Sequence, residues 1–284
     1  MTEEGEEGVK TGIALYIGMG AFIVLTQVIA LLLATLTDIE PAFENPESIW
    51  NPLYFFAMIM VFTAIILIVF KFGGDKFVYF VMLAAVAVTI YYVMVAAMQL
   101  LYLHSFLAVL ITIILTLLLY KYPEWYVLDA TGVVIGGGAT AIFGISLTIV
   151  PVLLLLILLA VYDAISVYKT KHMVTLAESI VDLRVPILFV LPRKRNFSLL
   201  KSTDMTEAFY MGLGDAIIPS ILVVTAFMQF TTVAPALGAI IGTLAGYTAL
   251  TRLAGKGTPH AGLPFLNSGA IIGFIIGFII GTVI

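Results

Sequence analysis

The stretch LLAVYDAISVY, residues 158–168, closes an apolar run long enough to cross a membrane, yet it contains Asp163. A second apolar stretch, YMGLGDAIIPS at residues 210–220, contains Asp215. A carboxylate in hydrocarbon costs roughly 2.5–3.5 kcal/mol on insertion scales, so a membrane helix keeps one mainly where it has a function. The two aspartates are therefore the first candidates for a functional site.

The composition of the chain is that of a polytopic membrane protein. Of 284 residues, 62% are hydrophobic and 11% are charged, whereas a soluble domain carries about 25% charged residues. There is no cysteine, which excludes disulfides, thiol catalysis and cysteine-bound metals. The acidic start, MTEEGEEGVK, lacks the layout of a cleaved signal peptide, so the first span is expected to stay in the membrane.

Stretches of about 20 mostly apolar residues predict an all-α membrane protein with nine transmembrane helices. They lie near residues 12–36, 52–70, 77–98, 104–120, 125–144, 148–169, 207–230, 233–250 and 262–283. Residues 1–284 then form a single membrane domain, with N-terminal spans over about 12–169, a loop over about 170–206 and C-terminal spans over about 207–283.

The basic residues predict how these spans are oriented. All 13 Lys and Arg residues fall in the N-terminal tail or in the second, fourth, sixth and eighth loops, which share one side of the membrane. Basic residues in short loops favour the cytoplasm. The N-terminus is therefore predicted to be cytoplasmic and the C-terminus outside, in a multi-pass protein of the cell membrane. The cluster Arg193–Arg195 fits this rule and contact with anionic lipid, so no nucleic-acid binding is expected.

The loop after the sixth span has a mixed pattern. Its first part has apolar residues partly at helical spacing, which predicts an interfacial helix. The short apolar run between Pro186 and Pro192 predicts an extended segment.

The nine-span arrangement places the two aspartates at similar depth. Asp163 lies six residues before Lys169 at the cytoplasmic end of the sixth span, or about 9 Å at 1.5 Å per residue. Asp215 lies eight residues after Glu207 at the start of the seventh span, or about 12 Å. Adjacent antiparallel helices would thus allow the two carboxylates to meet.

A pair of carboxylates has a chemistry of its own. Two close carboxylates share one proton and titrate as a coupled unit. The ionised one can take a proton from water as the water attacks a carbonyl, while its protonated partner donates a hydrogen bond to the carbonyl oxygen. This is aspartyl-protease chemistry, and it needs neither metal nor cofactor. The sequence also has no His-Glu-x-x-His motif for zinc, so no metal site is expected.

The residues around both aspartates resemble the signature motifs of the presenilin and signal peptide peptidase family of intramembrane aspartyl proteases. Tyr162-Asp163 is similar to the first motif, and GLGD at Gly212–Asp215 to the second. The third motif, Pro-Ala-Leu at the start of the last span, is matched by AGLP at Ala261–Pro264. Here Ala and Gly stand in place of Pro and Ala. The resemblance covers the whole chain, and its orientation is closer to presenilin than to signal peptide peptidase.

The resemblance implies roles for the matching residues, with Asp163 and Asp215 as the catalytic pair. The supporting active-site residues would be Tyr162, Gly212, Leu213 and Gly214, and the substrate-binding residues Ala261, Gly262, Leu263 and Pro264. Gly212 and Gly214 would let another backbone approach Asp215. Since Pro264 biases Leu263 away from helix, residues 261–264 are expected to stay extended and to pair with an unwound substrate strand.

Other polar and small residues in the spans have structural interpretations. Asp129, four residues into the fifth span, is expected to be a solvated residue at the end of a helix. Glycines recur every fourth residue in the eighth and ninth spans, which favours close helix packing. The run IGGG at residues 135–138 is expected to serve packing or flexibility.

One function is expected, and one alternative stays open. The expected function is hydrolysis of peptide bonds within transmembrane helices by a two-aspartate, water-activating mechanism. The alternative is a proton- or cation-coupled transporter or ion-leak channel in which the same aspartates are ligands. The expected partners are a transmembrane-helix protein or peptide and the lipid bilayer. Nothing in the sequence demands a partner subunit, and a homo-oligomer remains open.

Overall fold

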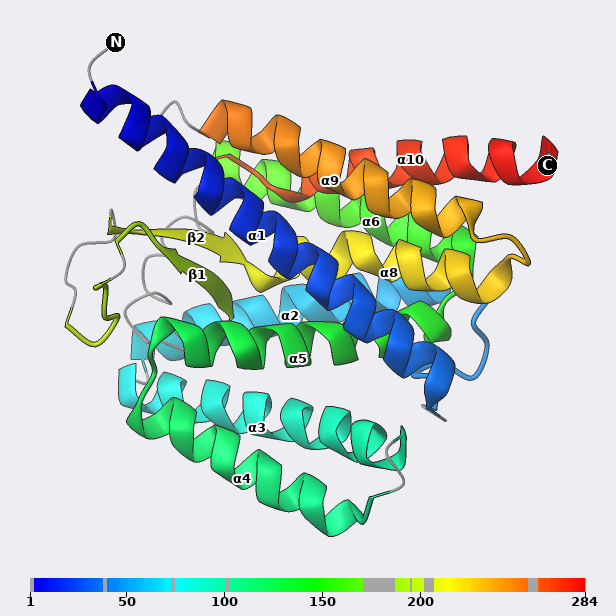
Figure 1. Cartoon of the computed structure of the whole chain (residues 1–284). Helices are drawn as coiled ribbons and strands as arrows, with labels where there is room; N and C mark the ends of the chain where they lie inside the picture. The colour runs from blue at the N-terminus through cyan, green and yellow to red at the C-terminus, as the bar shows by residue number, and fades with distance from the viewer. Residues whose placement is uncertain are drawn as a thin grey trace.

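The computed structural model describes residues 3–37, 40–72, 75–100, 103–170, 187–194, 196–201, 207–254 and 260–283. Within these ranges the chain forms nine α-helices, one π-helical turn and a two-stranded sheet (Figure 1). The helices are α1 (Glu3–Leu36), α2 (Trp50–Phe72), α3 (Asp75–Leu100), α4 (Ser105–Lys121), α5 (Trp125–Ser146), α6 (Ile149–Ile165), α8 (Leu213–Gln229), α9 (Ala234–Ala254) and α10 (Leu263–Val283). The π-helical turn η1 covers Ser166–Thr170, and the strands are β1 (Leu188–Pro192) and β2 (Ala208–Gly212).

The lengths and surfaces of the helices are those of an integral membrane protein. Six apolar segments are long enough to cross a bilayer, namely Gly12–Leu36, Lys76–Gln99, Trp125–Ser146, Ile149–Lys169, Ala234–Leu253 and Leu263–Val283. Three further apolar helices are shorter. Large apolar side chains face outward, such as Ile17 at 68% exposure and Phe106 at 72%. The all-helical polytopic fold is therefore confirmed, while nine crossings and their orientation stay predictions.

Helix α8 occupies the centre of the bundle (Figure 1). It packs against α1 and α5 on one side and against α6, α9 and α10 on the other. All its residues from Ile218 to Ala226 are buried. Since this helix carries Asp215 in its first turn, the packing that buries α8 also fixes one of the two candidate catalytic residues.

Helices α9 and α10 are packed through interleaved glycines, as the spacing in the sequence predicts. Cβ atoms built on α9 at Gly238, Gly242 and Gly246 would lie 2.1 Å, 2.0 Å and 2.2 Å from backbone carbonyl oxygens of α10. Cβ atoms built on α10 at Gly269, Gly273 and Gly277 would lie 2.2 Å, 2.1 Å and 2.2 Å from carbonyl oxygens of α9. Only glycine allows two helix backbones to approach so closely.

The two strands form an antiparallel hairpin that leads directly into α8. Val190 is opposite Tyr210 in the register, and the ladder is extended by a 2.9 Å hydrogen bond from the Leu213 amide to the Ile187 carbonyl. Strand β1 confirms the extended segment predicted between Pro186 and Pro192. The interfacial helix predicted before it falls largely on residues 171–186, outside the described ranges.

Strand β2 corrects the predicted start of the seventh span. The sequence predicts helix from residue 207, but residues 208–212 form a strand and the helix begins at Leu213. A short apolar run can be assigned to a buried strand or to a buried helix with equal justification, because periodicity alone does not separate them. Pairing with β1, a contact from elsewhere in the chain, determines the outcome.

Candidate active site

Asp163 lies two residues before the end of α6, and the π-helical turn η1 follows it. The backbone amide of Leu263 donates a hydrogen bond of 3.0 Å to Oδ2 of Asp163. The amide of Gly262 also faces this half-buried carboxylate. The first amides of a helix have no acceptor within it, so the carboxylate of Asp163 accepts from the beginning of α10 and positions it.

Asp215 is the third residue of α8 and is half-buried. The sequence places it eight residues inside a helix, but five of those residues belong to β2. A strand rises about 3.3 Å per residue and a helix about 1.5 Å, so the two conformations reach different depths over the same residues.

The segment Gly262–Leu263 contacts both carboxylates. While Leu263 bonds to Asp163, a Cβ atom built on Gly262 would lie 2.7 Å from Oδ1 and 2.8 Å from Oδ2 of Asp215. The carboxylate of Asp215 therefore rests directly on the Gly262 backbone. The two aspartates are also close enough to interact electrostatically. The end of α6, the start of α8 and the start of α10 thus converge on one carboxylate pair.

The segment at the start of α10 differs from its predicted conformation. The sequence predicts that residues 261–264 stay extended, but Leu263 and Pro264 belong to the first turn of α10. Proline is well tolerated there, since the first helical amides have no acceptor and its fixed φ suits a helix. Within the described residues, only His260, Ala261 and Gly262 precede the helix as non-helical backbone.

The residues before Gly262 are held by the π-helical turn after Asp163. The hydroxyl of Tyr168 accepts a hydrogen bond of 3.3 Å from the amide of Ala261 and lies 3.4 Å from Nδ1 of His260. One short segment of α6 and η1 therefore holds both sides of Gly262, through Asp163 and through Tyr168. No motif in the sequence marks Tyr168, which lies in the same apolar stretch as Asp163.

The remaining supporting residues lie around the same point. Tyr162 packs edge-on against Phe56 of α2, with ring centroids 5.8 Å apart. A Cβ atom on Gly212 would lie 3.4 Å from Oδ2 of Asp215, while one on Gly214 would have no described atom within 4 Å. The space at Gly214 is open, and within the described residues the backbone that approaches the Asp215 carboxylate is that of Gly262.

Leu213 is buried against α5, where the IGGG run begins. Its Cδ1 would lie 3.6 Å from a Cβ atom on Gly132 and 3.4 Å from one on Gly136. Farther along the run, a Cβ atom on Gly138 would lie 2.0 Å from a methyl carbon of Val93. The packing interpretation of residues 135–138 is confirmed, and these glycines let neighbouring side chains lie flat on α5.

Asp129 is a third acid near the site, and its expected solvation is wrong. Its exposure is 3%, and its Oδ1 accepts a hydrogen bond of 2.7 Å from the amide of Val190 in β1. Asp129 lies near the N-terminal end of α5, and a residue there is exposed only if no other segment covers that end. The hairpin covers it, so Asp129 fixes β1 against α5.

A small cavity lies beside Asp215. Its volume is about 220 Å³, and its lining includes Met211 of β2, Tyr247 of α9 and Gly262. Most of the other lining side chains are apolar. The cavity therefore connects the exit of β2, one catalytic candidate and the segment before α10.

Comparisons with known proteins agree with this geometry. A family model described as signal-peptide peptidase, presenilin aspartyl protease matches residues 20–283. The chain belongs to this family. Two solved structures, each described as a presenilin family intramembrane aspartate protease, are similar to this presenilin-type chain. The one in space group C222 has 38% identity and a TM-score of 0.69, and the one in space group P2 has 39% and 0.70. Each match covers 93% of this chain and 97% of the other.

Membership in the presenilin family, together with the apolar helices, makes the protein an intramembrane aspartyl protease whose substrates lie in a lipid bilayer. The comparison with curated proteins gives no match. The match to the family model extends over residues 20–283, so it includes all three segments that meet at the candidate site.

Proposed function

We propose that this presenilin-type protease cleaves peptide bonds within transmembrane helices with Asp163 and Asp215 as its catalytic pair. The observation that supports the proposal is that two adjacent residues, Leu263 and Gly262, contact the carboxylates of Asp163 and Asp215 respectively. In the proposed mechanism the two carboxylates share one proton.

The shared proton gives the two aspartates complementary roles. The ionised carboxylate takes a proton from water as the water oxygen attacks the scissile carbonyl carbon, and the protonated partner donates a hydrogen bond to the carbonyl oxygen. When the C–N bond breaks, the carboxyl that gained the proton passes it to the leaving amine. The products are a carboxyl group and an amine, and no metal or cofactor takes part.

The substrate must present an extended segment, since a helix keeps its carbonyls in its own hydrogen bonds. Two features obstruct the outer edge of β1 for an added strand. The outward amide of Val190 is bonded to Asp129, and Pro192 has no amide to donate. Strand β2 leads directly to Asp215 and lines the cavity beside it. An unwound substrate segment therefore adds beside β2 and runs past Gly262 to the carboxylates.

The other residues serve the same reaction by position. Ala261 and Gly262 border the path of the substrate, and Leu263 and Pro264 begin the helix whose amides hold Asp163. Gly212, Leu213 and Gly214 make the transition from strand to helix before Asp215. Tyr162 packs beside Asp163 on the α2 side.

The proposed context is a single membrane domain in the cell membrane with nine crossings, a cytoplasmic N-terminus and an external C-terminus. The basic residues support this orientation, since all 13 fall on one side of nine spans. The site then opens near the cytoplasmic face. We propose that the purified chain acts without a partner subunit.

The test is cleavage of a single-span peptide by the purified chain in detergent. The variants Asp163→Asn and Asp215→Asn keep the side-chain shape but lose the ionisable carboxyl. Each should reduce the rate at least about a hundredfold, the usual contribution of general acid–base catalysis. Glu44→Gln, which removes an exposed carboxylate between α1 and α2, should cleave like the parent.

Thermal unfolding shows whether each variant is folded. If either folded aspartate variant cleaves as fast as the parent, that residue is not catalytic and the proposed mechanism fails. The assay has no ion gradient. Cleavage under these conditions supports the protease function, whereas coupled transport would require a gradient.

A further inference from the structure

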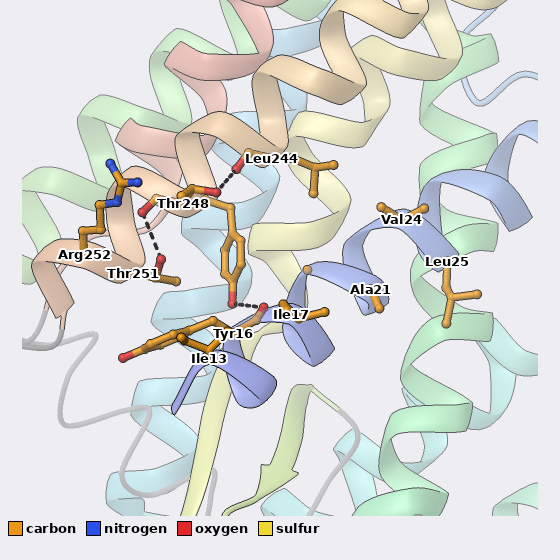
Figure 2. A pocket seen from close by; sticks show the side chains of 12 residues that line it. Ile13, Tyr16, Ile17, Ala21, Val24, Leu25, Leu244, Thr248, Thr251 and Arg252 are labelled. Carbon is orange, nitrogen blue, oxygen red and sulfur yellow. Dashed lines mark hydrogen bonds between the residues drawn. The ribbon is translucent and has the colours of Figure 1, made fainter. Parts of the chain in front are cut away.

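A second cavity lies apart from the candidate active site, between α1 and α9 (Figure 2). It is lined by one face of α1 between Ile13 and Leu25 and by one face of α9 between Leu244 and Arg252, and its volume is about 910 Å³. We call it the α1–α9 groove. It opens on the outer surface of the bundle, where Leu25 is 47% exposed. The proposed mechanism does not use this groove.

The dimensions of the α1–α9 groove match one leaflet of a bilayer. Ile13 and Leu25 are twelve residues apart, which corresponds to about 18 Å along a helix. The hydrocarbon core of a bilayer is about 30 Å thick, so one leaflet contributes about half of that. A lipid acyl chain fits this length, whereas a substrate helix that crosses the membrane would extend well beyond the groove.

The two ends of the groove differ in polarity. Leu25 lies at one end and Arg252 at the other, beside the hydroxyl groups of Thr248 and Thr251 (Figure 2). Arg252 is near the end of α9, on the side predicted to face the cytoplasm, where lipid headgroups lie. A guanidinium group binds phosphate oxygens in pairs, and basic pockets between membrane helices on this side bind anionic headgroups.

We propose that the α1–α9 groove binds an anionic phospholipid, with its phosphate at Arg252 and an acyl chain along α1 toward Leu25. The apolar lining and the one-leaflet length favour an acyl chain, and the positive charge of Arg252 favours an anionic headgroup.

The floor of the groove is shared with the cavity beside Asp215. Tyr247 donates a hydrogen bond of 3.0 Å from its hydroxyl to the Tyr16 carbonyl. Tyr247 and Thr251 line both the groove and the cavity that contains Asp215. The bound lipid therefore packs against residues that also border the candidate active site.

The proposal is tested by native mass spectrometry of the delipidated full chain in detergent, titrated with phosphatidylglycerol or with neutral phosphatidylcholine. The parent should bind one phosphatidylglycerol more tightly than phosphatidylcholine. Arg252→Gln should weaken the first phosphatidylglycerol about fivefold, as expected for one basic residue near an anionic headgroup, and leave phosphatidylcholine unchanged. Ala21→Trp, which fills the exposed side of the groove, should weaken both lipids.

Two matched variants serve as controls. Lys121→Gln removes an exposed charge at the end of α4, and Val28→Trp introduces the same side chain at an exposed position of α1 outside the groove. Both should bind lipid like the parent. If Arg252→Gln and Ala21→Trp are folded and bind phosphatidylglycerol as the controls do, the site is not in this groove. A photoreactive group at Ile17 that captures the peptide substrate instead of lipid would equally overturn the proposal. Neither readout depends on cleavage.

Discussion

Replacing Gly242 by alanine should destabilise the protein, although the same change in an ordinary helix stabilises it by about 0.5–1 kcal/mol. The new Cβ would lie 2.0 Å from the carbonyl oxygen of Gly269 and 2.9 Å from the Cα of Gly273. Ordinary contact begins at 3.4 Å, so the backbones of α9 and α10 would have to separate locally by about 1.4 Å. Overpacking of this kind costs about 1–3 kcal/mol, and the separation also weakens the Cα–H···O contacts between the helices.

The assay is thermal unfolding in detergent, with Gly12→Ala as the matched control. Gly12 is also helical, but a Cβ atom there meets nothing within 4 Å. Gly242→Ala should melt several degrees below the parent, at about 2–4 °C per kcal/mol for a chain of 150–250 residues. The control should melt at the parent temperature or slightly above it. If both variants melt alike, the backbones adapt without loss and the reasoning from close approach is refuted.

Three further predictions concern Asp129, proton dependence and metals. Asp129→Leu should lower the free energy of unfolding by about 1–3 kcal/mol because the Val190 amide is left buried without an acceptor. Asp129→Asn keeps an acceptor for that amide and should melt at a higher temperature than Asp129→Leu. Equal melting temperatures of the two variants would contradict the role of Asp129 in fixing β1. The rate of cleavage should rise and then fall with pH, because the pair Asp163 and Asp215 works with one proton between them; a rate that changes in one direction only would exclude a shared proton. EDTA should leave cleavage unchanged, since the described residues contain no group of three or more acidic or histidine side chains suited to a metal; a loss reversed by added metal would show otherwise.

The sequence predicts the helices of this fold well because each one is marked by its own composition. Apolar length and polar breaks are local properties, so the boundaries of most helices agree within a few residues. The glycine spacing also predicts close helix packing for the eighth and ninth spans, although not that α9 and α10 are each other's partners. The failures are at residues whose state depends on a distant segment. Strand β2 is defined by β1, and Asp129 is buried because the hairpin covers it.

The candidate site was only partly accessible from the sequence. Asp163 and Asp215 are conspicuous because a carboxylate in a membrane helix is costly. The spacing allows them to meet, but the contact of Gly262 with Asp215 and the bond from Leu263 to Asp163 are tertiary facts. Pro264 does not determine the conformation of residues 261–264, since a proline can follow an extended segment or lie in the first turn of a helix. The part of Tyr168 in holding Ala261 has no signal in the sequence beyond its nearness to Asp163.

The obstructed outer edge of β1 has a consequence for turnover. In the proposed binding mode the substrate adds beside β2 as a single strand, and the cleaved strand stays paired there until it dissociates. Product and substrate then compete for the same backbone groups. The enzyme should show competitive product inhibition, with an inhibition constant set by the fragment that pairs with β2. Release of that fragment, and not hydrolysis, would then set the rate for substrates with strong strand propensity.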